Sequence, residues 1–171
     1  MSDRSVAFVG LGSNLDDPLM QLSRARAAMA ALPASRLRES SPIYRSAPMG
    51  PADQPDYLNA VVAMETTLEP HALLRALQAI EQEQGRVRHR HWGERTLDLD
   101  ILLYGDLEMD DEALTLPHPG IGVREFVLYP LADLAPDLDI PGQGPVQLLR
   151  DRVEARGLQR TKLPWSDAGC F

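Results

Sequence analysis

The sequence predicts an α+β fold with a ferredoxin-like βαββαβ core, in which an antiparallel sheet carries helices on one face, plus a C-terminal helical appendage. Strand-like apolar runs and segments with helical apolar spacing alternate in that order up to residue 104, and Gly and Pro clusters separate them. The length of 171 residues suits one domain over 1–171, with a core at about 5–140 and an extension at 141–171.

The first strand and the first helix have clear local signals. Residues 6–9, Val-Ala-Phe-Val, form a β-branched and aromatic run. The glycine-containing segment 10–14 predicts a turn that ends this strand. Asp17 is a suitable N-cap and Pro18 suits the first helical position, so a helix is expected to start there and to stop at Pro33.

The middle of the chain predicts two strands around a loop. Residues 36–45 mix apolar and polar side chains and predict a second, irregular strand. Residues 46–56 hold three prolines and a glycine and predict a loop, which is long enough to suggest a functional role. Residues 57–66 predict the third strand.

The second helix and the last core strand complete the predicted plan. Pro70 starts a helix with regularly spaced apolar residues, and Gly85 should end it. After a basic loop, residues 97–104 predict the fourth strand. The remainder predicts a turn at 117–119, a helix near 124–132, a Pro/Gly link at 141–145 and a helix near 146–156.

Composition excludes several classes of protein. The net charge is −8, which makes a general nucleic-acid binder unfavourable because phosphate neutralisation needs a basic surface. A lone cysteine, Cys170, can form neither an internal disulfide nor a cysteine-rich zinc site. The N-terminus has no signal-peptide pattern and no stretch approaches the roughly 18 apolar residues of a membrane span. We expect a cytoplasmic monomer with no nucleic-acid or membrane partner.

A pair of carboxylates gives the strongest chemical signal. In a strand over 97–104, Asp98 and Asp100 share one face while Leu97, Leu99 and Ile101 bury on the other. Their side chains would lie about 7 Å apart along the strand. Such a pair can hold Mg²⁺ with substrate phosphates completing the metal shell. The alternative is a half-buried strand with a solvated acidic face.

The segment just before this strand is basic. Residues 86–95 contain four arginines, Arg86, Arg88, Arg90 and Arg95, against one acid, Glu94. Arginines beside a carboxylate pair suit phosphoryl transfer, because they bind the non-bridging oxygens while a metal neutralises charge. A solvated surface loop is the alternative interpretation.

Other candidates are weaker individually. Tyr57 and Asn59 share a face of the third strand, where a ring could stack on a heterocycle and an amide could bind its edge. They could equally be an edge aromatic and a strand-end amide. Trp92 and Phe126 are by default apolar packing residues, and His118 lies in a proline-rich turn.

These pieces together resemble the 6-hydroxymethyl-7,8-dihydropterin pyrophosphokinase family of folate biosynthesis. The resemblance covers about residues 6–140. It rests on Gly-Ser-Asn-Leu at 12–15, Ser-Pro-Ile-Tyr-Arg at 41–45, the 50–59 segment with Asp-Gln-Pro-Asp-Tyr-Leu-Asn, and Gly-Arg-Val-Arg at 85–88. The most diagnostic run is Trp-Gly at 92–93 with Arg-Thr-Leu-Asp-Leu-Asp-Ile at 95–101, followed by Pro-His-Pro at 117–119 and Arg-Glu-Phe at 124–126.

The resemblance implies a role for each matching residue. It implies two Mg²⁺ ions on Asp98 and Asp100, bridging the phosphates of the co-substrate ATP. The implied catalytic residues are Arg86, Arg95, Asp98 and Asp100. The implied nucleotide contacts are Gln78, Glu81, Arg88, Trp92, Ile101, His118 and Arg124. The implied pterin contacts are Gly12, Ser46, Ala47, Met49, Tyr57, Asn59 and Phe126, with Tyr57 and Phe126 sandwiching the ring.

The implied reaction moves pyrophosphate from MgATP to the hydroxymethyl oxygen of 6-hydroxymethyl-7,8-dihydropterin and releases AMP. Two alternatives come from other classes: a single-stranded RNA binder of the same element order, and a non-catalytic regulatory ligand-binding module. The RNA binder would need a basic sheet face with stacking aromatics, where this sequence places two aspartates. Nucleotide binding that depends on Mg²⁺ would separate both alternatives from the enzyme.

Overall fold

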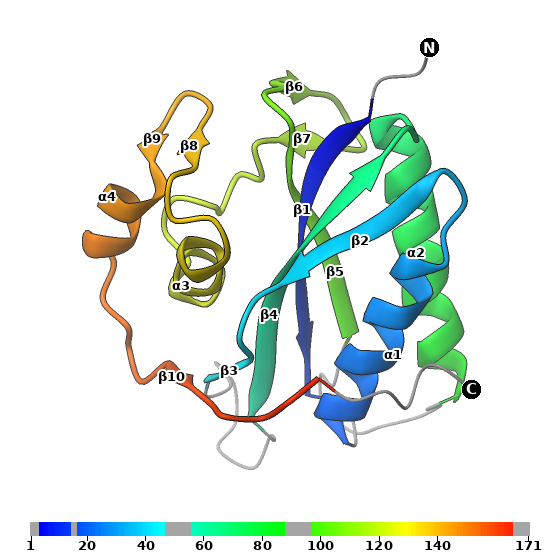
Figure 1. Ribbon diagram of the computed structural model, residues 1–171, viewed down its shortest axis with the longest axis horizontal. Coiled ribbons are helices and arrows are strands. Elements are labelled where there is room, and N and C mark those ends of the chain that lie inside the picture. Colours follow the sequence, from blue (N-terminus) through cyan, green and yellow to red (C-terminus); the bar gives the residue numbers. More distant parts are fainter. Residues whose placement is uncertain (1–3, 15–16, 47–55, 88–96, 166–171) are drawn as a thin grey trace.

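An antiparallel six-stranded sheet runs through the middle of the molecule (Figure 1). The protein is represented by a computed structural model that describes residues 4–14, 17–46, 56–87 and 97–165. The main sheet has the order β10-β3-β4-β1-β5, and β2 also pairs with β4. Its strands are β1 (Ser5–Ser13), β2 (Ser35–Ser40), β3 (Tyr44–Ser46), β4 (Tyr57–Thr66), β5 (Leu97–Tyr104) and β10 (Gln159–Arg160).

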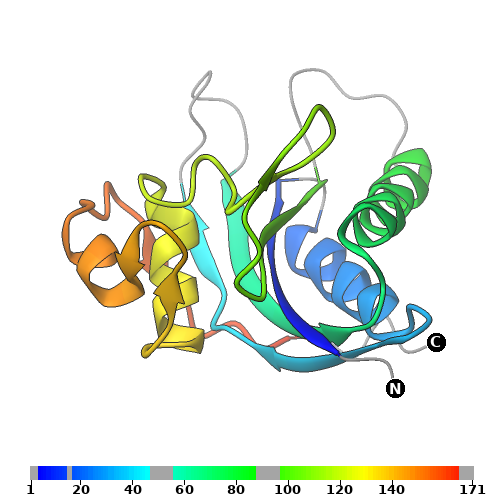
Figure 2. The same ribbon diagram turned by 90° about the horizontal axis from the view of Figure 1, so that it is seen from above.

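Helices α1 (Pro18–Ala30) and α2 (Pro70–Val87) cover one face of this sheet (Figure 2). Alternate residues of β1, β4 and β5 point to that face, and apolar side chains of the two helices pack on them. The fully buried contributors include Leu22 and Met29 from α1, and Leu73 and Leu77 from α2. The two core helices therefore share one face, as the sequence predicts.

The C-terminal part covers the other face of the sheet. Helices α3 (Glu125–Leu134) and α4 (Val146–Asp151) lie there, with the short hairpins β6 (Met109–Asp110)–β7 (Thr115–Leu116) and β8 (Asp139–Ile140)–β9 (Gly144–Pro145) nearby. A second core joins Val61 and Leu102 of the sheet to Leu128 and Leu131 of α3. The predicted appendage is therefore an integral layer of the fold.

Several element boundaries differ from the predictions. β1 continues to Ser13, through most of the segment that predicted a turn, and Gly10 lies against Leu102, whose side chain would be 3.5 Å from an added Cβ. Gly85 does not end α2, which continues to Val87. The irregular second strand is two strands, β2 and β3, and α4 is shorter than predicted.

The start of α1 confirms the predicted cap. Asp17 Oδ1 accepts a hydrogen bond from the Met20 N–H at 3.3 Å, and Pro18 occupies the first turn.

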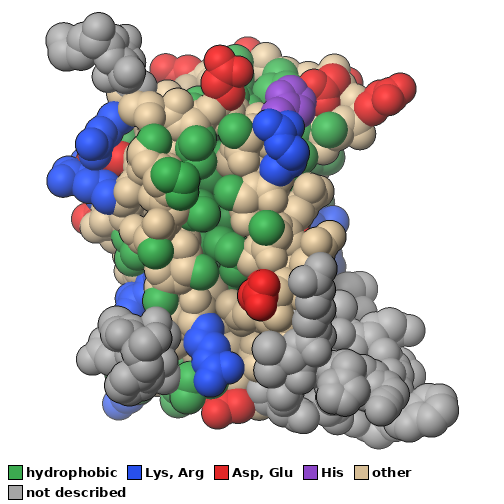
Figure 3. Space-filling view, turned by 90° about the vertical axis from the view of Figure 1, so that its right-hand side faces the viewer, with side chains coloured by type: hydrophobic (Ala, Val, Ile, Leu, Met, Phe, Trp, Pro, Cys, Tyr) green, Lys and Arg blue, Asp and Glu red, His purple; other side chains and the backbone are tan. Residues whose placement is uncertain are grey.

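The outer surface of α1 and α2 carries a band of hydrophobic side chains between charged ones (Figure 3). None of the helices in the described ranges is long and apolar enough to cross a membrane.

Candidate active site

The two aspartates of β5 lie on the sheet face opposite α1 and α2. Asp98 and Asp100 are exposed, whereas Leu97, Leu99 and Ile101 between and beside them are buried. This confirms the predicted alternation along the strand. The second core covers the far end of the same strand at Leu102 and stops short of the carboxylates.

A row of paired residues connects these carboxylates to the middle of the sheet. Gly12 of β1 pairs with Asp98 on one side and with Asn59 of β4 on the other, and Asn59 pairs with Tyr44 of β3. Directly paired residues share a face of an antiparallel sheet, so the row spans about 14 Å across four strands. Gly12 places no side chain between the carboxylate and the amide.

The amide of Asn59 is held in a defined orientation. Asn59 Nδ2 donates a hydrogen bond to Ser46 Oγ at 2.8 Å, and Asn59 itself is buried. A Cβ at position 12 would lie 3.1 Å from Asn59 Oδ1, so glycine fits closely here. Tyr57 pairs with Ser46 and is half-buried on the same face. The predicted pterin contacts Gly12, Ser46, Tyr57 and Asn59 therefore lie together.

The turn before α3 places His118 close enough to Asp100 and to Arg124 to feel both charges. The backbone N–H of His118 donates to Leu102 O at 3.0 Å, and the backbone N–H of Gly120 donates to His118 Nδ1 at 3.0 Å. Burial lowers the pKa of His118, with the Arg124 charge adding to this effect and the Asp100 charge opposing it. The neutral imidazole is therefore favoured in a site that also contains a guanidinium.

Phe126 and Arg124 lie against each other at the start of α3. The Arg124 guanidinium carbon is 5.8 Å from the centre of the Phe126 ring, within the range of a cation–π contact. The Arg124 side chain also lies over Gly120, where an added Cβ would meet Nε at 2.5 Å. Phe126 packs partly on the second core, which fixes the base of its ring.

Glu81 of α2 binds the free edge of β5. Its Oε2 accepts a hydrogen bond from the Leu99 N–H at 2.7 Å, between the two aspartates in the sequence. Burial raises the pKa of the Glu81 carboxyl, the Leu99 hydrogen bond opposes this, and the Asp98 and Asp100 charges add to it. This carboxylate therefore supports the strand that carries the pair.

The donor set suits Mg²⁺. Two exposed carboxylates on one strand face offer hard oxygen ligands, and Mg²⁺ commonly takes one or two carboxylates and completes its shell with water and substrate phosphates. Within the described ranges, no three His, Cys, Asp or Glu side chains gather closely enough to enclose an ion without such partners.

Some of the remaining predicted site residues lie within the described residues and others lie outside them. Gln78 is exposed on α2, and the side chain of Ile101 is buried in the first core. Several other predicted residues lie outside the described residues, namely Ala47, Met49, Arg88, Trp92 and Arg95. The backbone of Arg86 is in the last turn of α2, and its side chain is also outside the description.

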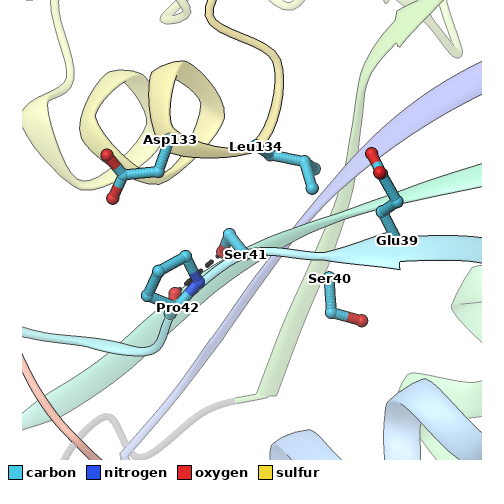
Figure 4. Close-up of a pocket in the computed structure, with 6 residues that line it drawn as sticks. All are labelled: Glu39, Ser40, Ser41, Pro42, Asp133 and Leu134. Atoms are coloured by element: carbon cyan, nitrogen blue, oxygen red, sulfur yellow. Dashed lines mark hydrogen bonds between the residues drawn. The ribbon is translucent and has the colours of Figure 1, made fainter.

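A hollow of about 310 Å³ lies between the β2–β3 junction and the end of α3, beside the Tyr44 end of this row (Figure 4). It is lined by Glu39, Ser40, Ser41, Pro42, Asp133 and Leu134. None of these was predicted from the sequence to be a site residue. The hollow contains neither the carboxylate pair nor the Asn59 amide. The residues suited to binding a metal ion and a heterocycle therefore lie in the row and not in the hollow.

Tyr44 belongs to the 41–45 motif, but the sequence predicted no individual role for it. Its side chain is 5% exposed, and its hydroxyl donates a hydrogen bond to Asp133 Oδ2 on α3. The available signal was its position two residues before Ser46, which places both side chains on one face of a strand. Nothing in the sequence indicated that Asp133, 89 residues further along the chain, is its hydrogen-bond partner.

Comparison with known proteins gives consistent similarities. Residues 8–136 match the family model described as 7,8-dihydro-6-hydroxymethylpterin-pyrophosphokinase (HPPK). Relatives called 2-amino-4-hydroxy-6-hydroxymethyldihydropteridine pyrophosphokinase include one from Pseudomonas aeruginosa, 57% identical over 78% of this chain and 83% of the relative. Another, from Haemophilus influenzae, is 54% identical over 79% and 84%. A third, from Methylorubrum extorquens, is 43% identical over 91% and 98%.

Solved structures support the fold. Wild-type Plasmodium falciparum HPPK-DHPS with pteroate has a TM-score of 0.70 at 13% identity, covering 89% of this chain and 43% of that one. The same wild-type protein with SDX-DHP has a TM-score of 0.68 at 13% identity, covering 89% and 45%. This chain therefore spans less than half the length of those two chains.

Proposed function

Because the chain belongs to the 7,8-dihydro-6-hydroxymethylpterin-pyrophosphokinase family, we infer that it transfers pyrophosphate from ATP to the hydroxymethyl group of 6-hydroxymethyl-7,8-dihydropterin in folate biosynthesis and releases AMP. The observation that carries this chemistry is the exposed Asp98–Asp100 pair on the face that also presents Asn59 and Ser46. All four residues lie within the matched range of 8–136.

We assign the phosphate end of the site to β5 and the turn before α3. Asp98 and Asp100 would hold two Mg²⁺ ions, which neutralise phosphate charge when bound. Arg124 supplies a positive charge near His118, and the neutral His118 offers a ring nitrogen whose partner depends on its tautomer. The predicted roles of Arg86, Arg88, Trp92 and Arg95 stay predictions, as do nucleotide contacts by Gln78, Glu81 and Ile101.

We assign the pterin end to β3, β4 and α3. The Asn59 amide and the Ser46 hydroxyl would bind the polar edge of the ring, and Gly12 leaves room for its approach. Tyr57 and Phe126 would stack on the two ring faces. Ala47 and Met49 remain predicted pterin contacts. This end positions the hydroxymethyl oxygen toward the carboxylate pair.

The reaction balances as one in-line displacement. The hydroxymethyl oxygen forms a bond to the β-phosphorus of ATP, the bond from that phosphorus to the α,β-bridging oxygen breaks, and AMP leaves with that oxygen. The hydroxyl proton passes to solvent. We assign no side chain as general base, because positioning of the two substrates accounts for much of the rate in such transfers.

The test is AMP release by the purified protein, measured by chromatography. AMP should form only when ATP, 6-hydroxymethyl-7,8-dihydropterin and Mg²⁺ are all present, in a 1:1 ratio with the pterin diphosphate. AMP formation that does not need the pterin would indicate simple hydrolysis and would overturn the proposal.

We propose further that the core is ferredoxin-like, which the strand order with β1 between β4 and β5 supports. A single domain, a monomeric state, a cytoplasmic location, and the lack of a nucleic-acid or membrane partner stay proposals drawn from the sequence.

A further inference from the structure

The C-terminal segment 159–165 lies along strand β3 (Figure 1). Strand β10 pairs with β3, with Gln159 opposite Arg45 and Arg160 opposite Tyr44. Immediately after it, the Thr161 N–H and the Thr161 hydroxyl both donate to Ile43 O, at 2.9 and 2.7 Å. The segment thus satisfies backbone groups on the edge of β3 that β4 does not reach.

The far end of this segment is anchored on the run that leads into β3. Trp165 Nε1 donates to Ser41 O at 3.0 Å, and the Arg26 guanidinium carbon lies 4.5 Å from the centre of the Trp165 ring. Leu163 and Trp165 also pack on the first core. The segment therefore runs alongside Arg45 and Tyr44 of β3 and on past Ile43 to Ser41, and apolar packing holds its far end.

A side-chain link joins the same strand to α3. Asp133 Oδ2 accepts hydrogen bonds from the Tyr44 hydroxyl and from Arg160 Nη1, the second at 3.4 Å. Tyr44 is buried, whereas the Arg160 side chain is 59% exposed. Most of the restraint on β3 at this point therefore comes from the tyrosine, since exposed ion pairs contribute little.

Strand β3 depends on such neighbours. It is only three residues long, and its one other partner in the sheet is β4. It nevertheless carries Ser46, whose hydroxyl orients the Asn59 amide. The position of β3 therefore sets where the Ser46 hydroxyl meets the Asn59 amide.

We propose that the segment 159–165, together with the Tyr44–Asp133 hydrogen bond, positions β3 for pterin binding. The segment lies beyond the residues 8–136 that match the family model. Thr161 and Tyr44 are positioning residues that act through Ile43 and Ser46. This inference rests on the proposed function, because it assigns the pterin to the Ser46–Asn59 pair.

The test uses Thr161→Val and Tyr44→Phe, which remove single hydroxyls and keep the side-chain shape. Each should raise KM and Kd for 6-hydroxymethyl-7,8-dihydropterin by about three- to tenfold, the range expected for one hydrogen bond. KM for ATP should change by less than about twofold. Calorimetry gives Kd for the pterin independently of turnover.

Matched controls lose the same kind of hydrogen bond elsewhere. Thr115→Val removes the Thr115 hydroxyl bond to Asp110 Oδ1 at 2.8 Å, in the β6–β7 hairpin. Tyr129→Phe removes the Tyr129 hydroxyl bond to Val153 O at 2.9 Å, on the same helix as Asp133. Both should lower the Tm about as much as the test variants and leave the pterin constants unchanged.

An unchanged pterin Kd in both test variants would overturn the inference, and so would an equal rise in both controls. Wild-type protein that binds the pterin tightly and yet releases no AMP would overturn the proposed function alone, because the Kd comparison would still decide the role of β3. Wild-type protein that does not bind the pterin would overturn both.

Discussion

Asp98 and Asp100 show how two residues acquire a function from their place on a strand. Successive side chains of the strand point to opposite faces, so each aspartate is exposed while its neighbours are buried. Both aspartates also lie beyond the residues of the second core. The alternation was predictable from the sequence alone, since it follows from the geometry of a strand. The proximity of Asp100 to His118 was not, because His118 lies on a separate turn.

Replacing either aspartate by asparagine should remove most activity and leave the fold intact. Asp98→Asn and Asp100→Asn keep the side-chain shape but lose a negative oxygen ligand, and we expect kcat to fall by about 10²-fold or more. Steady-state kinetics over a range of Mg²⁺ concentrations, with circular dichroism for the fold, measures this. Asp106→Asn, an exposed aspartate just after β5, is the matched control. Near-native activity of both variants at low Mg²⁺ would refute the metal-site assignment.

The two proposed stacking rings should affect the pterin more than ATP. Tyr57→Ala and Phe126→Ala should each weaken pterin binding by about 1 kcal/mol or more, because a stacked ring is lost. Calorimetry with each substrate separates the two affinities. Tyr57→Phe keeps the ring and should bind normally, while Phe126→Leu keeps apolar volume against the second core without the ring. A fall in ATP affinity instead would place these rings in the nucleotide site.

At the scale of elements, long periodic segments were predictable and short strands were not. Helices α1 and α2 show regular apolar spacing and lie where that spacing predicts. Strands β3 and β10 have three and two residues, too few to show a period, and their pairing depends on contacts far apart in the sequence. Strand β1 was predicted too short because Gly10 and Gly12 suggest a turn. In the structure both glycines lie within the strand, close to side chains of the neighbouring strands.

The link between β3 and α3 should be visible in alkaline stability. Burial raises the pKa of Tyr44 above its ordinary value of 10.0, and the hydrogen bond to Asp133 adds to this. Stability from a raised pKa is fully present below the unfolded value and is lost as pH rises toward the folded value. The Tm advantage of wild type over Tyr44→Phe should therefore be constant from about pH 8 to 9 and shrink above about pH 10.

Thermal unfolding followed by circular dichroism at closely spaced pH values measures this difference. The plateau below about pH 9 serves as the internal control, since a tyrosine of ordinary pKa stays mostly protonated there. A Tm difference that stays constant through about pH 11.5 would mean that Tyr44 does not hold its proton more strongly in the folded protein.

At the scale of the whole molecule, helices cover both faces of one sheet, and among the described residues the second layer does not extend over the Asp98 end of β5. Helices α1 and α2 cover their face as the sequence predicts. On the other face, α3 covers the sheet around Val61 and Leu102, and the uncovered end presents Asp98. The sequence predicted the class of fold, but the second layer joins residues from 121 to 149 with the sheet, and no local pattern indicates that packing.

The protein is expected to transfer a pyrophosphoryl group and not a single phosphate at the end of the sheet that presents Asp98 and Asp100. The direct measurement uses ATP labelled with ³²P at the β-phosphorus, incubated with the protein, Mg²⁺ and 6-hydroxymethyl-7,8-dihydropterin, with the products separated by chromatography. All transferred label should appear in the pterin product, and the nucleotide product should be unlabelled AMP. Label retained in ADP, with an unlabelled pterin, would contradict this expectation.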